Sequence, residues 1–207
     1  AVVSDRPDRE LILAALGGLP LSRLTELSST QYEEMARQEK LSEYDVIVLD
    51  SYLPKVLEPD SPGLPPGRYL VLNALPGGTS GIVDGGKGEG TGIIDWSRDH
   101  PVLRNVSFDT LLIAQSHVVT LAPGALARSI ATAENGPAIL EITKADTRAI
   151  VVTFDLAQTN WPFDAGFVVF FGSTIRYLGD DAQGGGVPRL LQPGSVLSDR
   201  IPSTATS

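Results

Sequence analysis

The chain of 207 residues contains no cysteine. It therefore has no disulfide bond, no metal site built on thiolates and no cysteine nucleophile, and these absences exclude several classes of enzyme. They do not assign a compartment, because extracytoplasmic bacterial domains also commonly avoid cysteine.

Long apolar runs are missing as well. The longest strongly apolar run, residues 165–171, is far too short to span a bilayer, and the first residues show no charged region followed by an apolar signal core. We therefore expect the chain as given to be soluble and not to insert into a membrane.

Basic residues are few and scattered. The chain carries 16 Lys and Arg against 25 Asp and Glu, which gives a formal net charge of −9 at pH 7. Nucleic-acid binding requires clustered Lys and Arg that neutralise phosphates, so nucleic acid is not an expected partner. Hydrophobic residues make up 42% of the chain and charged residues 20%, as is typical of a globular protein.

Only two histidines are present, His100 and His117. A serine hydrolase needs a histidine and a serine with a glycine two residues before and two after it, and Ser80 has only the first of these glycines. We interpret His117 as a strand residue at a sheet margin and His100, which precedes Pro101, as a locally hydrogen-bonded residue. Neither histidine has a second ligand at a helical or hairpin spacing, so no metal site is predicted.

The glycine-rich segment 85–92, GGKGEGTG, resembles a phosphate-binding loop only superficially. Such a loop requires Ser or Thr after the lysine, whereas Lys87 is followed by Gly88, and the spacing of a dinucleotide-binding motif is also missing. We therefore predict a mobile connection over residues 77–92, and no cofactor.

Three short, largely apolar runs, at 45–50, 68–74 and 149–154, predict strands covered on both faces. A strand at 2–3 precedes a helix that Ser4 or Asp5 would cap and that would end at Gly17 and Gly18. An outer strand over 21–27 and a surface helix over 29–41 come next. Strands alternating with helices predict an open, mostly parallel α/β sheet.

The second half is richer in strands. We predict a turn and a short helical piece over 96–106, strands at 110–121 and 127–133, and a hairpin between 138–143 and 147–154, which together add antiparallel strands to the sheet. A buried helix begins at Pro162, after Asn160 or Trp161 as its cap, and Gly179 ends it. We assign residues 1–180 to one domain and 181–207 to a Gly-, Pro- and Ser-rich tail or the start of a truncated following region.

Asp50, Asn73 and Asp155 each fall at the carboxyl end of a predicted buried strand. Ligands of open α/β sheets bind at that edge, although such residues also serve as caps of loops and helices. Together with His100, these three residues form our candidate pocket for a small ligand or for a hydrolytic reaction.

The segments 44–54, 69–76, 99–106 and 151–178 resemble the class I glutamine amidotransferase-like domain of BatA-type bacterial membrane proteins, which carry N-terminal transmembrane helices and a von Willebrand factor A domain. The resemblance covers about residues 1–180. It implies a flavodoxin-like three-layer α/β/α sandwich, in a domain of a membrane-anchored protein that lies on the extracytoplasmic side.

The same resemblance implies that catalysis has been lost. Class I amidotransferases use a cysteine at a strand-to-helix elbow with a downstream histidine and glutamate, and here Leu75, Pro76 and Gly77 come after the elbow strand. No catalytic residue of the family is carried over. We expect a non-catalytic interaction or structural domain whose partners are other domains of the same polypeptide or proteins of a membrane complex, with a homodimer as a further possibility. The competing hypothesis is an enzyme or small-ligand binder that uses the candidate pocket.

Overall fold

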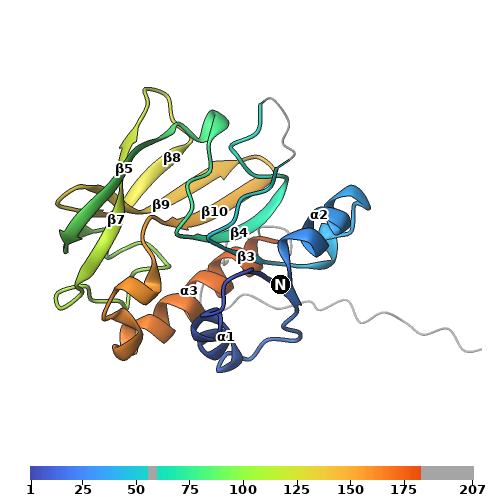
Figure 1. Ribbon diagram of the computed structural model, residues 1–207, viewed down its shortest axis with the longest axis horizontal. Helices are drawn as coiled ribbons and strands as arrows, with labels where there is room; N and C mark the ends of the chain where they lie inside the picture. The colour runs from blue at the N-terminus through green and yellow to red at the C-terminus, as the bar shows by residue number, and fades with distance from the viewer. Residues whose placement is uncertain (56–59, 183–207) are drawn as a thin grey trace, which may run out of the picture.

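A computed structural model describes residues 1–55 and 60–182 of the chain (Figure 1). The predicted tail, apart from its first two residues, lies outside the described residues. The elements in chain order are β1 (Val2–Val3), α1 (Glu10–Gly17), β2 (Glu26–Leu27), α2 (Ser29–Arg37), η1 (Leu41–Glu43), β3 (Ile47–Asp50), β4 (Gly67–Leu72), η2 (Gly78–Ser80), β5 (Ile82–Thr91), β6 (Ile93–Trp96), β7 (Ile113–Leu121), β8 (Ala127–Ala133), β9 (Gly136–Lys144), β10 (Thr147–Val152), η3 (Leu156–Gln158), η4 (Trp161–Phe163) and α3 (Ala165–Ala182).

One eight-stranded sheet organises the molecule, with the strand order β2-β1-β3-β4-β10-β9-β8-β6. The strands from β2 to β10 pair in parallel, and those from β10 to β6 pair antiparallel. The prediction of a mostly parallel sheet extended by antiparallel strands is therefore confirmed. A separate ribbon of β5 and β7 joins this sheet where His117 N–H donates to Thr153 O at 2.9 Å.

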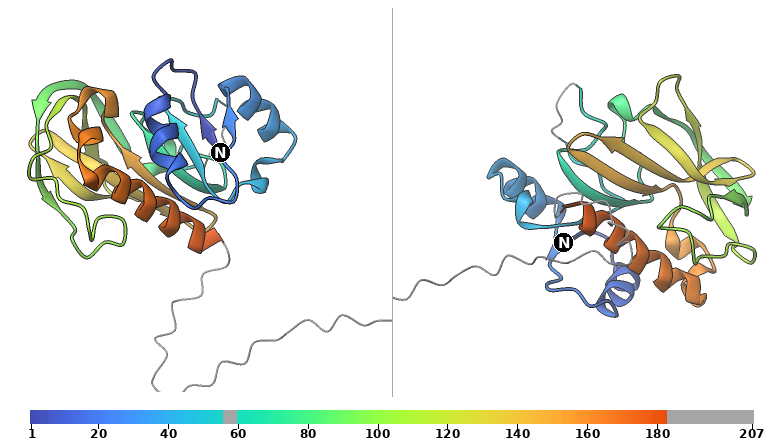
Figure 2. Two further views of the ribbon diagram at one scale, coloured as in Figure 1. Left: turned by 90° about the horizontal axis from the view of Figure 1, so that it is seen from below. Right: turned by 180° about the vertical axis from the view of Figure 1, so that it is seen from behind.

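Each face of the sheet is covered by a different layer (Figures 1 and 2). Ile150 and Val152 of β10 point into the core that α1 and α3 close, whereas Ala149 and Val151 point into a second core shared with Tyr32 of α2. The alternation results from the two-residue period of a strand. The predicted three-layer α/β/α architecture, of the flavodoxin-like type, is thus confirmed.

Trp161 is the centre of an aromatic cluster between β10 and α3. It is 1% exposed, and its ring centroid lies 4.9–6.0 Å from four phenylalanine rings, those of Phe108, Phe154, Phe167 and Phe170. The cluster joins the end of β10, the turn before β7 and the first half of α3. Trp161 is therefore a packing residue of the core.

The closing helix differs from the prediction at both ends. Trp161–Phe163 forms a 3-10 turn, and α3 begins only at Ala165, after Asp164 accepts a hydrogen bond from Gly166 N–H at 2.6 Å. At the other end α3 continues through Gly179 to Ala182, so the predicted glycine stop was wrong. A glycine costs a helix only about 1 kcal/mol, which is less than packing of the flanking residues supplies.

The expected burial of this helix region was also only partly correct. Phe167, Phe170 and Leu178 are buried, but Phe163 is 93% and Val168 47% exposed. The apolar residues surround the helix, and the sheet can cover only one side of it.

The predicted glycine-rich connection contains strand β5, which pairs antiparallel with β7. The prediction failed because its glycines allow a close approach between strands. A Cβ atom on Gly88 would lie 2.9 Å from Val118 Cγ2, and Gly86, at the irregularity between Asp84 and Lys87, has a φ of 92° that other residues avoid.

Three further elements differ from the prediction in position or type. Arg9, and not Ser4 or Asp5, precedes α1, and no side chain caps that helix. The predicted outer strand shortens to β2, Glu26–Leu27, and the predicted helical piece within 96–106 is a series of turns instead. The expected capping residues bond elsewhere: Ser4 Oγ donates to Asp50, and Asp5 accepts a hydrogen bond from Ser29 N–H.

We predict that Phe170→Ala lowers the free energy of unfolding by about 3–5 kcal/mol, because a fully buried ring is lost and a cavity remains in the aromatic cluster. Phe163→Ala is the matched control, since the same atoms are removed from a side chain that is 93% exposed, and it should change stability by less than about 0.5 kcal/mol. Urea denaturation of both variants measures the difference, and equal losses would contradict the description of the core.

Candidate functional site

The carboxyl ends of the parallel strands meet at one edge of the sheet, as the topology requires. Asp50 ends β3, Asn73 comes directly after β4, Asp155 comes shortly after β10, and all three line one small hollow together with Arg6 from the loop after β1. Three of the four predicted pocket residues are therefore brought together. His100 does not line this hollow.

Asp50 is the buried acid of the site, with 5% of its surface exposed. Its Oδ2 accepts a hydrogen bond from Ser4 Oγ at 2.7 Å. Burial raises the pKa of Asp50, and the hydrogen bond from Ser4 and the charge of Arg6 offset only part of that effect.

Arg6 links the loop after β1 to the ends of β3 and β10. Its Nη1 donates to Asp155 Oδ2 at 2.8 Å and to Ser51 Oγ at 3.0 Å, while its Nε donates to Asp8 Oδ1 at 2.8 Å. These carboxylates raise the pKa of Arg6 further above its ordinary value. The sequence prediction missed Arg6, although the loop after an inner parallel strand is a position where ligand-binding residues occur.

Ser51 and Asn73 both adopt a left-handed backbone conformation, with φ values of 51° and 52°. They come directly after neighbouring parallel strands, and Asn73 Nδ2 donates to Ser51 Oγ at 3.0 Å. Such a conformation costs a residue with a side chain about 1–2 kcal/mol, less for asparagine. Paired strain at the edge of a sheet is a feature of binding sites, and it marks this hollow as the candidate site.

The chemistry of the hollow is limited. Asp155 Oδ1 accepts a hydrogen bond from Ala157 N–H at 3.0 Å, so this residue also caps η3, which is the alternative role that the sequence left open. Within residues 1–55 and 60–182 no group of three or more potential ligands could hold a metal ion. The site has the hydrogen-bonding groups to hold a small polar molecule, and its one arginine already pairs with two carboxylates.

His100 lies in a second polar cluster, on the face of the sheet that α3 covers. It is 6% exposed, and its Nδ1 accepts a hydrogen bond from Val102 N–H at 3.3 Å, which agrees with the predicted local role. Its Nε2 lies 3.6 Å from Glu141 Oε2, and its ring packs against the edge of Tyr177 at 5.3 Å between centroids.

Glu141 is the centre of this cluster and is 3% exposed. It accepts hydrogen bonds from Arg128 Nε at 2.7 Å and from Tyr177 Oη at 2.5 Å. Burial alone would raise the pKa of Glu141, but His100, Tyr177 and Arg128 together lower it to about 2. Sequence reasoning missed this residue, whose signal is a single carboxylate in an otherwise apolar strand.

The other histidine, His117, lies on β7 with its Nδ1 3.3 Å from Asp84 on β5, as expected of a residue at a sheet margin. It stands apart from Glu141 and from the hollow lined by Asp50.

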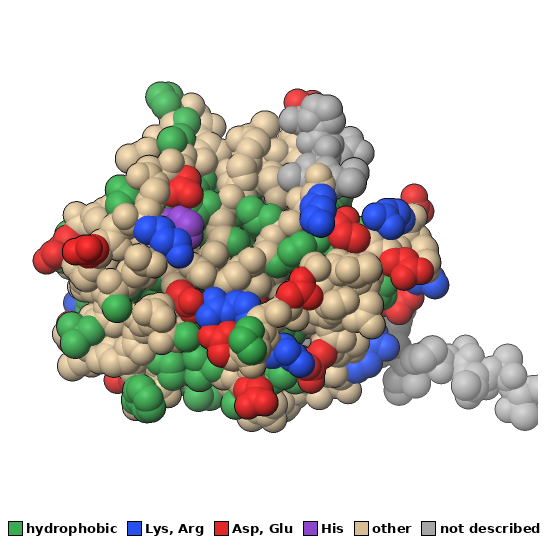
Figure 3. All heavy atoms as spheres, viewed as in Figure 1, with side chains coloured by type: hydrophobic (Ala, Val, Ile, Leu, Met, Phe, Trp, Pro, Cys, Tyr) green, Lys and Arg blue, Asp and Glu red, His purple; other side chains and the backbone are tan. Residues whose placement is uncertain are grey.

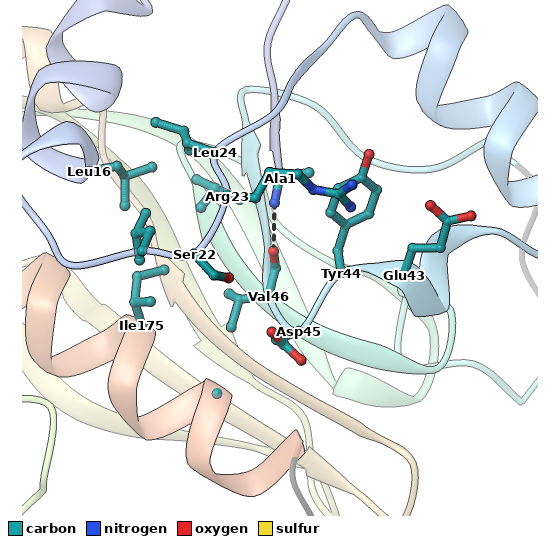
Figure 4. A pocket seen from close by; sticks show the side chains of 13 residues that line it. Ala1, Leu16, Ser22, Arg23, Leu24, Glu43, Tyr44, Asp45, Val46 and Ile175 are labelled. Atoms are coloured by element: carbon teal, nitrogen blue, oxygen red, sulfur yellow. Dashed lines mark hydrogen bonds between the residues drawn. The ribbon is translucent and has the colours of Figure 1, made fainter.

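A further cavity of about 170 Å³ opens at the amino ends of β1 and β3 (Figure 4). Leu16 and Ile175 form one side, and Arg23, whose guanidinium lies 5.1 Å from the ring centroid of Tyr44, forms the other. None of the four predicted residues lines it, and no histidine does.

Comparison with protein-family models and with curated proteins finds no match. Solved structures do resemble the chain. A cytoplasmic protein from Salmonella typhimurium is 14% identical with a TM-score of 0.55, and the match covers 82% of this chain and 86% of that one. A candidate GMP synthase subunit from Thermoplasma acidophilum is 10% identical with a TM-score of 0.55, over 88% and 94% of the two chains.

The β-galactosidase from Rahnella sp. R3 is 13% identical with a TM-score of 0.54, over 79% of this chain but only 26% of that enzyme. The chain shares an α/β fold with these proteins. At such low identities the likeness concerns the fold alone. Across the described residues no helix combines the length and the apolar character needed to cross a membrane.

We predict that Glu141→Gln lowers the free energy of unfolding by roughly 1–3 kcal/mol at neutral pH, because the hydrogen bonds to a buried carboxylate weaken. The folded-state pKa lies below the ordinary value of 4.5, so the stabilisation is present above that pH and is lost as the pH falls towards 2. Urea denaturation at several pH values should show the gap between the two proteins closing in that range.

Tyr177→Phe removes one of the donors and keeps the carboxylate, so it should lose part of the same pH-dependent stability. If the difference in unfolding free energy between Glu141→Gln and the original protein stays constant between neutral pH and pH 3, the lowered pKa of Glu141 is contradicted.

Asp50 should show the opposite pH dependence. Burial raises the pKa of Asp50 above its ordinary value of 3.8. Ionisation of this carboxyl is therefore harder in the folded than in the unfolded chain, and it lowers the stability as the pH rises above 3.8. Asp50→Asn should therefore become more stable relative to the original protein between about pH 4 and neutral pH, as thermal unfolding would measure. Ser4→Ala removes the hydrogen bond to ionised Asp50 and should enlarge the loss of stability with rising pH. If the pH dependence of stability is the same in both variants as in the original protein, the raised pKa of Asp50 is refuted.

Proposed function

We propose that the chain is a non-catalytic class I glutamine amidotransferase-like domain of a larger, membrane-anchored bacterial protein, and that it serves protein interaction or structure. The resemblance of segments 44–54, 69–76, 99–106 and 151–178 supports this assignment. A flavodoxin-like sandwich is the architecture that the resemblance implies.

The main support for the proposal is Asn73, the residue directly after β4. A nucleophile elbow holds its nucleophile in a strained turn between a strand and a helix. Asn73 has such a backbone, with a φ of 52°, at the end of an inner strand of the sheet. Its carboxamide is not a nucleophile, the chain has no cysteine, and the next regular element is the 3-10 turn η2 and not a helix.

The position of the histidines supports the loss of catalysis. Acyl transfer needs the base within hydrogen-bond reach of the nucleophile. His100 instead lies beside Glu141 under α3, and His117 lies beside Asp84 on the ribbon. The hydroxyl of Ser51, at the end of β3, accepts hydrogen bonds from Arg6 and Asn73 and has no imidazole partner.

The role within a larger protein is supported by fold analogy. In the β-galactosidase from Rahnella sp. R3, the region of similar fold makes up about a quarter of the enzyme, since 26% of that chain is covered. We propose the same kind of arrangement here, on the extracytoplasmic side of a membrane, with other domains of the polypeptide or proteins of a membrane complex as partners.

A second candidate function is the binding of a small polar ligand at the carboxyl edge. The convergence of Asp50, Asn73 and Asp155 on one hollow, with two strained residues beside it, favours this alternative. Binding is favoured over hydrolysis because neither histidine lines the hollow.

We predict that the purified chain releases no ammonia from glutamine or from a glutaminyl peptide above the rate of the buffer. A known class I amidotransferase serves as the positive control, and Ser51→Ala serves as the matched variant that removes the hydroxyl at the edge. Ammonia release that Ser51→Ala abolishes would overturn the non-catalytic assignment. Glutamine-dependent shifts of the Asn73 side-chain amide in NMR spectra, without ammonia release, would favour the second candidate.

A further inference from the structure

Phe163 and Leu112 are two strongly exposed apolar residues whose backbones both bond to Asn160, and we call them the apolar knuckle. Phe163 is 93% exposed and Leu112 69%. Figure 3 shows apolar side chains along the lower left margin of the molecule, over the start of α3 and the turn that leads into β7. Exposed apolar groups that gather in one place mark interaction surfaces more often than single exposed residues do.

The knuckle is held rigidly from both sides. Asn160 Oδ1 accepts a hydrogen bond from Leu112 N–H at 2.8 Å, and Asn160 Nδ2 donates to Thr110 O at 2.9 Å. Phe163 N–H donates to Asn160 O at 3.2 Å, and the intervening Trp161 is anchored in the core. The fold therefore holds the backbone that presents Phe163 and Leu112, so mainly side-chain rotamer freedom would be lost in ordering them against a partner.

The surface continues beyond the pair. A hollow beside Leu112 is lined largely by glycine and polar residues, among them Gly90, Gly92, Gln158 and Thr159. Val168 and Val169, on the outer face of α3, are 47% and 37% exposed. Together these features offer a groove next to a projecting ring.

Carboxylates surround the knuckle. Asp164 comes directly after Phe163, Asp109 lies in the turn that precedes Leu112, and Glu134 lines the hollow; all three are exposed. Over the described part of the chain none of them forms an ion pair. The two segments that carry Leu112 and Phe163, residues 105–127 and 149–175, contain no Lys or Arg.

We propose that the apolar knuckle docks a cationic amphipathic segment of a partner protein, one with an apolar face bordered by Lys or Arg. Charge complementarity selects this occupant. A second copy of the chain would bring like charges together across a two-fold axis, and a bilayer with anionic headgroups would be repelled. The inference rests on the proposed role in protein interaction and names the surface and the chemistry of the partner.

The test uses the full chain and a synthetic helix with leucines on one face and lysines along its borders. A second helix, identical except that glutamate replaces every lysine, is the matched probe. Calorimetric titration should detect binding of the lysine helix and none of the glutamate helix. Raising the salt concentration from about 50 to about 500 mM should weaken the binding severalfold.

Variants locate the site. Phe163→Ser should weaken binding of the lysine helix at least about tenfold, because the variant loses the ring that the bound helix would bury. Val83→Ser, which removes an apolar side chain that is 49% exposed on β5, should leave the affinity unchanged. Circular dichroism confirms that both variants are folded.

The lack of cysteine allows a direct footprint. Ala165→Cys, between Phe163 and Val168, would be the only thiol in the chain, and the bound lysine helix should slow its alkylation. Ser42→Cys, in η1 next to α2, is the control and should react at the same rate with and without the helix.

The inference is overturned if both helices bind equally, if Phe163→Ser has no effect, or if neither thiol is protected. It is also overturned if the chain dimerises in ultracentrifugation and Phe163→Ser abolishes the dimer, since the occupant is then a second copy. Binding that appears only after removal of residues 183–207 would assign the knuckle to that segment instead. Amidase activity would refute the proposed function and leave these binding results unchanged, so the two failures can be distinguished.

Discussion

The double pairing of β10 is the constraint on which the rest of the structure depends. This strand pairs in parallel with β4 and antiparallel with β9, over the same residues Thr147–Val152, and each of its last four side chains is fully buried. Where the strand is covered on both faces its side chains have to be apolar, which explains the run at 149–152. The segment after β10 is therefore fixed in space: Phe154 joins the ribbon, Asp155 reaches the carboxyl edge, and Trp161 anchors the turn that presents Phe163.

The inner strands could be predicted because their signal is local. Short, largely apolar runs over 45–50, 68–74 and 149–154 correspond to β3, β4 and β10 within a few residues. The ribbon strand β5 could not be predicted, because its glycines serve a contact with Val118 that lies far away in the sequence. The end of α3 failed for a related reason: local propensity places a stop at Gly179, whereas Leu178, fully buried, holds that part of the helix against the sheet.

The same distinction separates the predicted and the missed site residues. Asp50, Asn73 and Asp155 could be predicted because the ends of parallel strands share one edge, whatever the details of the loops. His100 was misplaced because its position depends on Glu141, a residue 41 positions later that the sheet places under α3. Arg6 was missed because its local sequence shows Asp8 but not Asp155, which lies 149 positions later and also holds its guanidinium.

The two polar clusters have in common that their groups bond mainly to one another. At the edge, Arg6 is neutralised by carboxylates, and under α3 the Glu141 carboxylate accepts hydrogen bonds from Arg128 and Tyr177. Such networks hold loops in place, and catalysis instead requires groups that are free to act on a substrate. The apolar knuckle is the reverse case: hydrogen bonds of Asn160 hold the backbone of this surface, while the side chains of Leu112 and Phe163 lie in solvent and add nothing to the core. A surface that is ordered but not used by its own chain is better explained by a partner than by chemistry.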